Sequence, residues 1–157
     1  IYGHGVFAPL RYYYICKTLG GFYKLYVHFF YHMVAFNDLL RIRSSSTLFQ
    51  LHGAAAVAER LSFLNTGPRQ VPEVIVGHLL GRGYPGANFS EILYLVNVDT
   101  GPRTLHFDGE RGKSYVLHPV HRASGATDRR AAELASYDAS SGSFAVPART
   151  AVVFVVE

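Results

Sequence analysis

The sequence predicts a mainly β fold: an antiparallel β-sandwich of about seven or eight strands, preceded by one or two short helices. Three observations predict it. The chain ends on an apolar run, residues 151–156, whose valines and phenylalanine suit a strand buried on both faces. Further apolar runs of strand length precede it, each bounded by Gly, Pro, Asp or Ser. Helical spacing is confined to a short region that begins near Phe36.

The helices come first in this part of the chain. Phe36, Leu39 and Leu40 share one face at helical spacing, which predicts a helix over residues 36–43 that three serines end. Residues 54–61 predict a second short helix, because they are rich in alanine and other strong helix formers. An Asn-Thr-Gly-Pro turn follows, and beyond it the apolar period becomes that of strands.

The strands fill most of the remaining sequence. They are predicted over residues 60–64, 74–79, 92–98, 104–107, 114–117, 143–146 and 151–156. Their near-regular spacing, with turn residues between them, is typical of an antiparallel sandwich. We expect residues 122–139 to form a long surface loop and the last strand to close the sandwich at its edge.

The first part of the chain differs in composition. Residues 1–37 contain no Asp or Glu and are crowded with Tyr and Phe, whereas all eleven acidic residues lie at Asp38 or later. We therefore divide the chain into an aromatic-rich leader of unknown structure, residues 1–35, and a domain, residues 36–157. The start at Ile1 rather than Met indicates a fragment of a longer reading frame or a processed product.

We do not favour the hypothesis that the leader has a membrane role. A bilayer span needs about 20 apolar residues, and Lys17 and Lys24 interrupt this stretch. We expect residues 22–36 to pack on a neighbouring domain rather than to contact a membrane. A location on the membrane surface stays open as the alternative. No signal peptide is legible.

Charge and cysteine content exclude further classes of function. The formal charge is +4, and Arg and Lys are scattered without a basic run, so no nucleic-acid partner is predicted. Cys16 stands alone, which excludes an intrachain disulfide and a cysteine-based zinc site. No cofactor is implied by any pattern in the chain.

The histidines and the glycine-rich stretch do not predict a binding site. His28 and His32 would share a helix face, but no carboxylate lies near them in sequence to complete a metal site. His118 and His121 flank Pro119, and we expect them to splay apart at the rim of the sandwich. Residues 81–86 lack the Lys-Ser/Thr of a phosphate-binding loop.

The acidic residues do not predict a catalytic pair either. Asp99, Asp108, Glu110 and Asp138 all fall in predicted turns, where solvation and local capping explain them. The serines lack the G-x-S-x-G pattern of a hydrolase nucleophile. The sequence therefore predicts no catalytic, cofactor-binding or metal-binding residue.

Six pieces of the sequence, in order and with matching gaps, carry a family resemblance. They are FNDLLRIRSSSTLFQL, AAAVAERLSFLNTGP, VIVGHLLG, ILYLVNVD, SYVLHPV and FAVPARTAVVFVVE. Together they resemble the C-terminal region of pullulanase-type α-1,6-glucosidases over residues 36–157. Departures include Thr47, where the family usually has proline, and Leu80, where it often has aspartate. Residues 1–35 match nothing expected before this region.

The resemblance implies both a partner and a role. LLRIR resembles the last helix of a catalytic (β/α)8 barrel, and the rest resembles the all-β domain packed behind that barrel. The family hydrolyses α-1,6 linkages in pullulan and starch with an Asp nucleophile and a Glu acid in barrel loops. Those loops lie upstream of the matching residues, so no catalytic residue is carried over.

Two functions follow as hypotheses. The first is a non-catalytic C-terminal domain of a debranching enzyme, which stabilises the barrel and makes at most weak contact with α-glucan. This chain alone would not be an enzyme. The alternative is a free-standing carbohydrate-binding β-sandwich, whose candidate sugar-stacking rings are Tyr84, Phe89, Tyr94, Tyr115 and Tyr137.

Overall fold

The structure, a computed structural model, describes residues 34–157, and the compact unit Asp38–Glu157 is considered by itself. The predictions for residues 1–33, including the His28 and His32 pair and most of the leader, lie outside the described residues. Within the described part of the chain, no helix is long and apolar enough to cross a membrane.

Three short helical segments begin the described chain, and the sequence predicted the first and the third of them. Residues 34–44 are helical, followed by the 3-10 helix η1 (Thr47–Gln50) and by α3 (Ala54–Arg60). The first helix ends in the serine run, and Ser46 caps η1 by accepting a hydrogen bond from the backbone N–H of Leu48. The serines therefore end one helix and start the next.

Two hydrogen bonds explain why position 47 carries threonine and not the proline that is usual in the family. The backbone N–H of Thr47 donates to the carbonyl of Gly86 at 3.1 Å, and its hydroxyl donates to the carbonyl of Pro85 at 2.7 Å. A proline at this position could make neither bond, because it has no N–H and no hydroxyl. Thr47 thus ties η1 to the loop between two strands.

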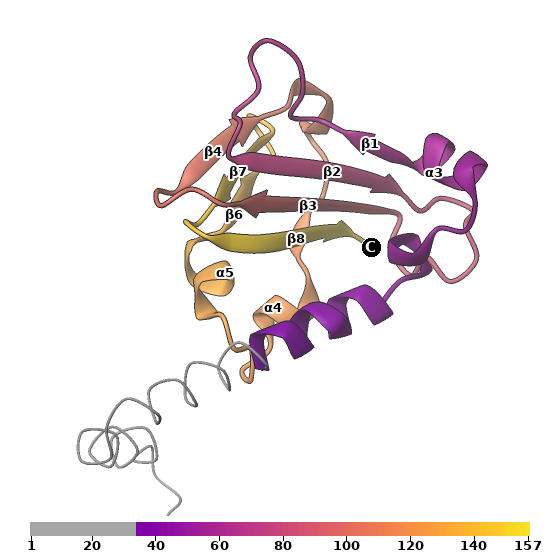
Figure 1. Ribbon diagram of the computed structural model, residues 1–157, viewed down its shortest axis with the longest axis horizontal. Coiled ribbons are helices and arrows are strands. Elements are labelled where there is room, and N and C mark those ends of the chain that lie inside the picture. The colour runs from indigo at the N-terminus through magenta and orange to yellow at the C-terminus, as the bar shows by residue number, and fades with distance from the viewer. Residues whose placement is uncertain (1–33) are drawn as a thin grey trace, which may run out of the picture. The chain divides into compact units, whose positions relative to one another are not determined.

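In the part of the chain that the structure describes, eight strands form two antiparallel sheets (Figure 1). The five-stranded sheet has the order β1 (Leu61–Phe63), β2 (Val74–Leu80), β3 (Glu91–Asn97), β8 (Thr150–Val156), β5 (Val116–Leu117). The three-stranded sheet has the order β4 (Arg103–His106), β7 (Ser143–Val146), β6 (Ser136–Asp138). The mainly β, sandwich-like class is confirmed, and all seven predicted strands are present with shifts of one or two residues.

Two predictions about the chain's later part are wrong. Residues 122–139 are not one long loop, because they include α5 (Arg129–Leu134) and β6, just after α4 (Pro119–Arg122). Six residues of helix and three of strand are too few to show a period in the sequence. The last strand is also not at an edge: β8 lies between β3 and β5.

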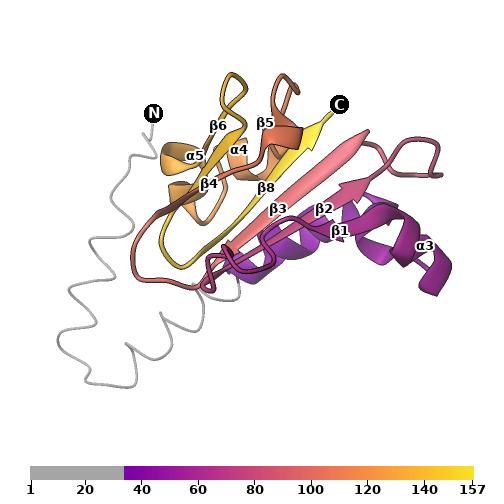
Figure 2. The same cartoon turned by 90° about the horizontal axis from the view of Figure 1, so that it is seen from above.

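The central place of β8 gives it two buried faces. Val152 and Phe154 point into the layer between the two sheets, while Val153 and Val155 point to the opposite face. All four are less than a tenth exposed. Figure 2 shows the two sides: α3 and residues 38–44 lie on one side of this sheet, and the second sheet with α5 on the other. The predicted two-sided burial of this run is confirmed.

Aromatic rings fill the inner layer around Phe144, which is fully buried on β7. Its ring lies 4.6 Å from that of Tyr137, 5.3 Å from that of Phe154 and 5.4 Å from that of Tyr115, measured between centroids. Such tilted and edge-to-face pairs stabilise a core beyond their buried area alone. Phe144 is therefore a central contact of the layer between the two sheets.

Replacing Phe144 with alanine should cost about 3–5 kcal/mol of unfolding free energy, because it leaves a cavity between the sheets. Urea denaturation of the whole chain measures this loss. Phe63→Ala is the matched control: Phe63 is 52% exposed, and its truncation should cost about 1 kcal/mol or less. Equal losses in the two variants would contradict the central position of Phe144.

Candidate functional site

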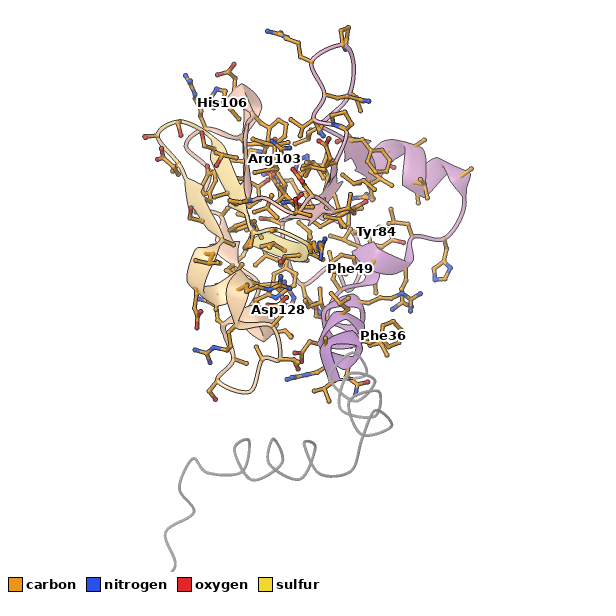
Figure 3. The ribbon with its side chains drawn as sticks, turned by 60° about the vertical axis from the view of Figure 1, so that its left-hand side comes forward. Phe36, Phe49, Tyr84, Arg103, His106 and Asp128 are labelled. Carbon is orange, nitrogen blue, oxygen red and sulfur yellow. The ribbon has the colours of Figure 1, made fainter. Side chains whose placement is uncertain are left out.

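An apolar groove of about 450 Å³ crosses the outer face of the five-stranded sheet, the face that carries η1 and α3. Residues 38–44 and α3 form its walls, and side chains of β2, β3 and β8 form its floor. Phe49 and Tyr84 lie on this side of the sheet in Figure 3, whereas Asp128 lies on the other. The groove lining includes Leu39, Ile42, Phe49, Val57, Leu79 and Tyr94.

The apolar surface continues beyond the groove along β1 and β2. Ile75 is 53% exposed and Phe63 is 52% exposed. Strand alternation places Ile75 on the same face as Leu79, and Ile75 pairs across the ladder with Val96, a groove residue. The groove and these two side chains therefore form one continuous apolar surface, which we name the outer face.

Gly77 shapes the floor of the outer face. It pairs with Tyr94 in the β2–β3 ladder, and the ring of Tyr94 lies over it so closely that any side chain at Gly77 would collide with the ring. Burial also raises the pKa of Tyr94. Sequence reasoning could not find this contact, because a glycine in a strand does not reveal which neighbour covers it.

His118 joins residues 38–45 to the sandwich. Its Nδ1 accepts from the backbone N–H of Val120 at 3.2 Å, so its Nε2 carries the proton and donates to the hydroxyl of Ser45 at 2.9 Å. Ser45 in turn donates to the carbonyl of Ile42 at 2.6 Å. Only 1% of His118 is exposed.

His121 completes the free edge of β8. The backbone N–H of Val153 donates to Nε2 of His121 at 3.2 Å, and the carbonyl of Val153 accepts from the backbone N–H of His118 at 2.9 Å. Both backbone groups lie where β5 has ended, so α4 and its cap satisfy them in place of a strand. We name His118 and His121 the histidine pair.

The predicted rim position of the histidine pair is wrong. Pro119 starts α4 at its first turn, where proline is favoured, and both rings turn inward instead of splaying. Burial, with the nearby charges of His121 and Arg122, lowers the pKa of His118 to about 4. Burial also lowers the pKa of His121, against the opposing effect of Asp128 and Asp38.

A second polar group lies between the sheets, where β2 ends and β3 begins. His78, Glu91, Glu110, Lys113 and Tyr115 converge there, and we name them the polar cluster. Nε2 of His78 lies 2.8 Å from Oε2 of Glu91, and the hydroxyl of Tyr115 lies 2.8 Å from a carboxylate oxygen of each glutamate. Nζ of Lys113 lies 2.6 Å from Oε2 of Glu91 and 2.8 Å from Oε2 of Glu110.

Glu110 therefore differs from its prediction as a solvated turn residue. It is the last residue of the 3-10 helix η2 (Asp108–Glu110), and only 5% of it is exposed. Of the other three acidic residues, Asp99 lies in a turn as predicted, whereas Asp108 begins η2 and Asp138 ends β6. Asp99 caps Thr100 and pairs with Arg103, Asp108 pairs with His106 and Arg111, and Asp138 accepts from Ser140 and Ser141.

The two glutamates of the polar cluster are close, but they do not have the surroundings of a glycosidase pair. Such carboxyl groups act on a sugar bound between them. Here the hydroxyl of Tyr115 and the ammonium of Lys113 fill the space between Glu91 and Glu110. His78 with the two glutamates does form the one described group of side chains whose ligand atoms could hold a metal ion.

The aromatic rings considered for sugar stacking are mostly packed. Tyr115 and Tyr137 belong to the inner layer, and Phe89 contacts the ring of His118 edge-on at 5.4 Å. Tyr94 covers Gly77, and the guanidinium of Arg60 lies 4.8 Å from the ring centre of Tyr84. Among these five residues the structure does not offer a flat, exposed ring of the kind that stacks on sugars.

Acidification should destabilise the fold through the histidine pair. The pKa of His118 is lower in the folded state than in the unfolded chain. The neutral ring therefore contributes its full stabilisation of the fold above about pH 6.5, and this contribution is lost as the pH falls toward 4. Through His118 alone, the change from pH 7 to pH 5 should lower the free energy of unfolding by about 2 kcal/mol. Urea denaturation at several pH values measures this slope.

His118→Asn separates titration from capping, because asparagine also caps a helix but does not titrate. The variant should be less stable than the parent at pH 7 and should show a shallower loss toward pH 5. His52→Asn, at an exposed position, should leave both values unchanged. A slope as steep in His118→Asn as in the parent would show that another group carries the pH dependence.

Comparison with known proteins supports the family resemblance. Residues 30–157 match the family of alpha-1,6-glucosidases, pullulanase-type, C-terminal. The chain is 38% identical over 138 residues to "Pullulanase 1, chloroplastic" of Arabidopsis thaliana, which covers 79% of this chain and 14% of that relative.

Solved pullulanases have the same fold in this region. The maltotriose complex of PulA from Klebsiella pneumoniae superposes with a TM-score of 0.66 and 26% identity, covering 77% of this chain and 13% of that one. PulA from Klebsiella oxytoca gives 0.64 and 24%, covering 76% and 11%. The chain thus spans about one seventh or less of these relatives. It belongs to the pullulanase-type α-1,6-glucosidases, and its matched residues correspond to their C-terminal region.

Proposed function

We propose that residues 36–157 are the non-catalytic C-terminal domain of an α-1,6-glucan debranching enzyme and stabilise its catalytic (β/α)8 barrel by packing the outer face against it. The observation that carries this proposal is the continuous apolar outer face, which the described residues leave half open. Residues 1–35 remain a separate leader in this proposal.

The outer face has the properties of a docking surface. Contiguous exposed apolar patches of this kind mark interaction sites on soluble proteins. Burying apolar surface stabilises an interface by about 25 cal/mol per Å². Ile75, Phe63 and Leu39 are all more than two fifths exposed, so each has apolar area left for a partner to cover.

The size of the relatives supports the choice of partner. The C-terminal region of these enzymes follows a much longer chain, of which this sequence covers 14% in the curated relative. The catalytic region therefore precedes the domain in the same polypeptide. A surface beside residues 38–44, where the chain enters the domain, is well placed to meet it.

The entering helix is held firmly enough to transmit that contact. Ser45 is bonded to His118 at 2.9 Å, and the carboxylate of Asp38 accepts from the backbone N–H of Thr127 at 2.8 Å. Both bonds join residues 38–45 to the α4–α5 region, more than 70 residues away in sequence. The helix and the sandwich thus act as one unit.

The non-catalytic role agrees with the chemistry of the described side chains. The one close pair of glutamates encloses a lysine and a tyrosine rather than a space for sugar. The alternative of a free-standing carbohydrate-binding module has less support, because the rings available to it are packed against other side chains. A weak contact with α-glucan stays part of the proposal without a site assigned to it.

A chimera tests the docking role. Residues 34–157 replace the corresponding C-terminal region of the Arabidopsis pullulanase, and pullulan cleavage and thermal inactivation are measured. We expect an active enzyme that Ile75→Asp together with Val96→Asp inactivates at a temperature lower by several degrees, because two charges would be buried at the interface.

Leu134→Asp is the matched control, since Leu134 is 62% exposed on α5, on the other side of the sheet. It should leave the inactivation temperature unchanged. Equal effects of the outer-face and Leu134 variants would contradict docking through the outer face. If neither variant changes the inactivation temperature of the chimera, docking through the outer face is contradicted as well.

The isolated chain should expose what the barrel would cover. We expect it to self-associate and to bind a dye that reports exposed apolar surface, and to cleave no pullulan above background. Ile75→Ser should reduce dye binding, whereas Leu134→Ser should reduce it less. A clean monomer in sedimentation that binds no dye, or turnover of pullulan, would contradict the proposal.

A further inference from the structure

The polar cluster has the donor set of a metal site. The Nε2 atom of His78 and one carboxylate oxygen each of Glu91 and Glu110 lie within 4.8 Å of one another. Imidazole and carboxylate are the ligands that zinc and other divalent transition metals take in proteins. His78 and Glu110 are 7% and 5% exposed, so their donors point into the protein.

The centre of this donor set is already occupied by a cation of the chain itself. The ammonium of Lys113 lies 2.6 Å from Oε2 of Glu91 and 2.8 Å from Oε2 of Glu110, in contact with both carboxylates that would bind a metal. A metal ion and this ammonium could not both contact those atoms. The hydroxyl of Tyr115 lies 2.8 Å from each of the same two oxygens.

The charges show why a cation is needed there. Two carboxylates taken out of water require compensation, and leaving one uncompensated is strongly destabilising. Burial raises the pKa of Glu91, but hydrogen bonds from Lys113, Tyr115 and His78 outweigh it and hold that pKa below its usual value. Burial lowers the pKa of Lys113, and its bonds to Glu110 and Glu91 more than reverse this.

The bonds also have a mechanical consequence. Glu110 is the last residue of η2, and Lys113 and Tyr115 follow it in the connection to β5, whereas His78 and Glu91 come from β2 and β3. The ring of Tyr115 belongs to the inner layer, with its hydroxyl in the cluster. The ammonium of Lys113 and the hydroxyl of Tyr115, which both contact Glu91 on β3, thus fasten this connection to the five-stranded sheet.

We propose that Lys113 is the built-in cation of a His–Glu–Glu site, which closes that site to metal in the native protein and leaves a site for a divalent transition metal when the ammonium is removed. A divalent ion would neutralise the two carboxylates fully, whereas one ammonium neutralises one of them. This inference is independent of the proposed docking role.

The test compares the whole chain with Lys113→Met, which keeps an unbranched side chain, one atom shorter, and removes its charge. Thermal unfolding is followed in excess EDTA and in excess ZnCl2. The parent midpoint should be the same in both. Lys113→Met should unfold about 5 °C lower in EDTA, and zinc should restore at least half of that loss.

Lys113→Met with His78→Gln is the control, because glutamine can still donate to Glu91 but does not replace imidazole as a zinc ligand. Zinc should not restore this double variant. Zinc binding at the other histidines of the chain would raise both variants alike, which would overturn the assignment to this site.

Three further results would overturn the proposal: a parent midpoint that zinc raises, a Lys113→Met variant as stable as the parent in EDTA, or a Lys113→Met variant that zinc does not stabilise. If Lys113→Met is unfolded in EDTA, circular dichroism after refolding in ZnCl2 gives the answer. Recovery of the β spectrum supports the proposal, and an unfolded chain in both conditions contradicts it.

Discussion

The fold depends on the burial of β8 on both faces. A strand in the middle of a sheet, covered on each side, must be apolar at successive positions, and Val152, Val153, Phe154 and Val155 meet that requirement. One pair of side chains builds the inner layer with the second sheet, and the other pair builds the layer beneath residues 38–48.

The same constraint explains the buried histidines. The edge of β8 that β5 leaves free is inside the protein, so its backbone groups need partners there. α4 brings the histidine pair to that edge, and the neutral rings supply an acceptor for Val153 and a donor for Ser45. A structural need of one strand thus becomes the bond between the entering helix and the sandwich, and it makes that bond sensitive to acid.

The two faces of the central sheet have different tasks. The inner face is closed by the second sheet, and its polar cluster is compensated within the chain by Lys113. The outer face is apolar and only partly covered, which is a surface that a larger enzyme can use. The proposed docking role therefore rests on the outer face alone.

The sequence alone determined the fold class, seven of the strands, the first helices and the family, because these depend on local period, turn residues and the order of several segments. It did not determine where β8 lies in its sheet or that Glu110, His118 and His121 are buried. It also did not show that β2, β3 and the η2–β5 connection bring their polar side chains together. Those facts depend on pairing between residues far apart in the chain, which no local pattern encodes, and only the tertiary structure decided them.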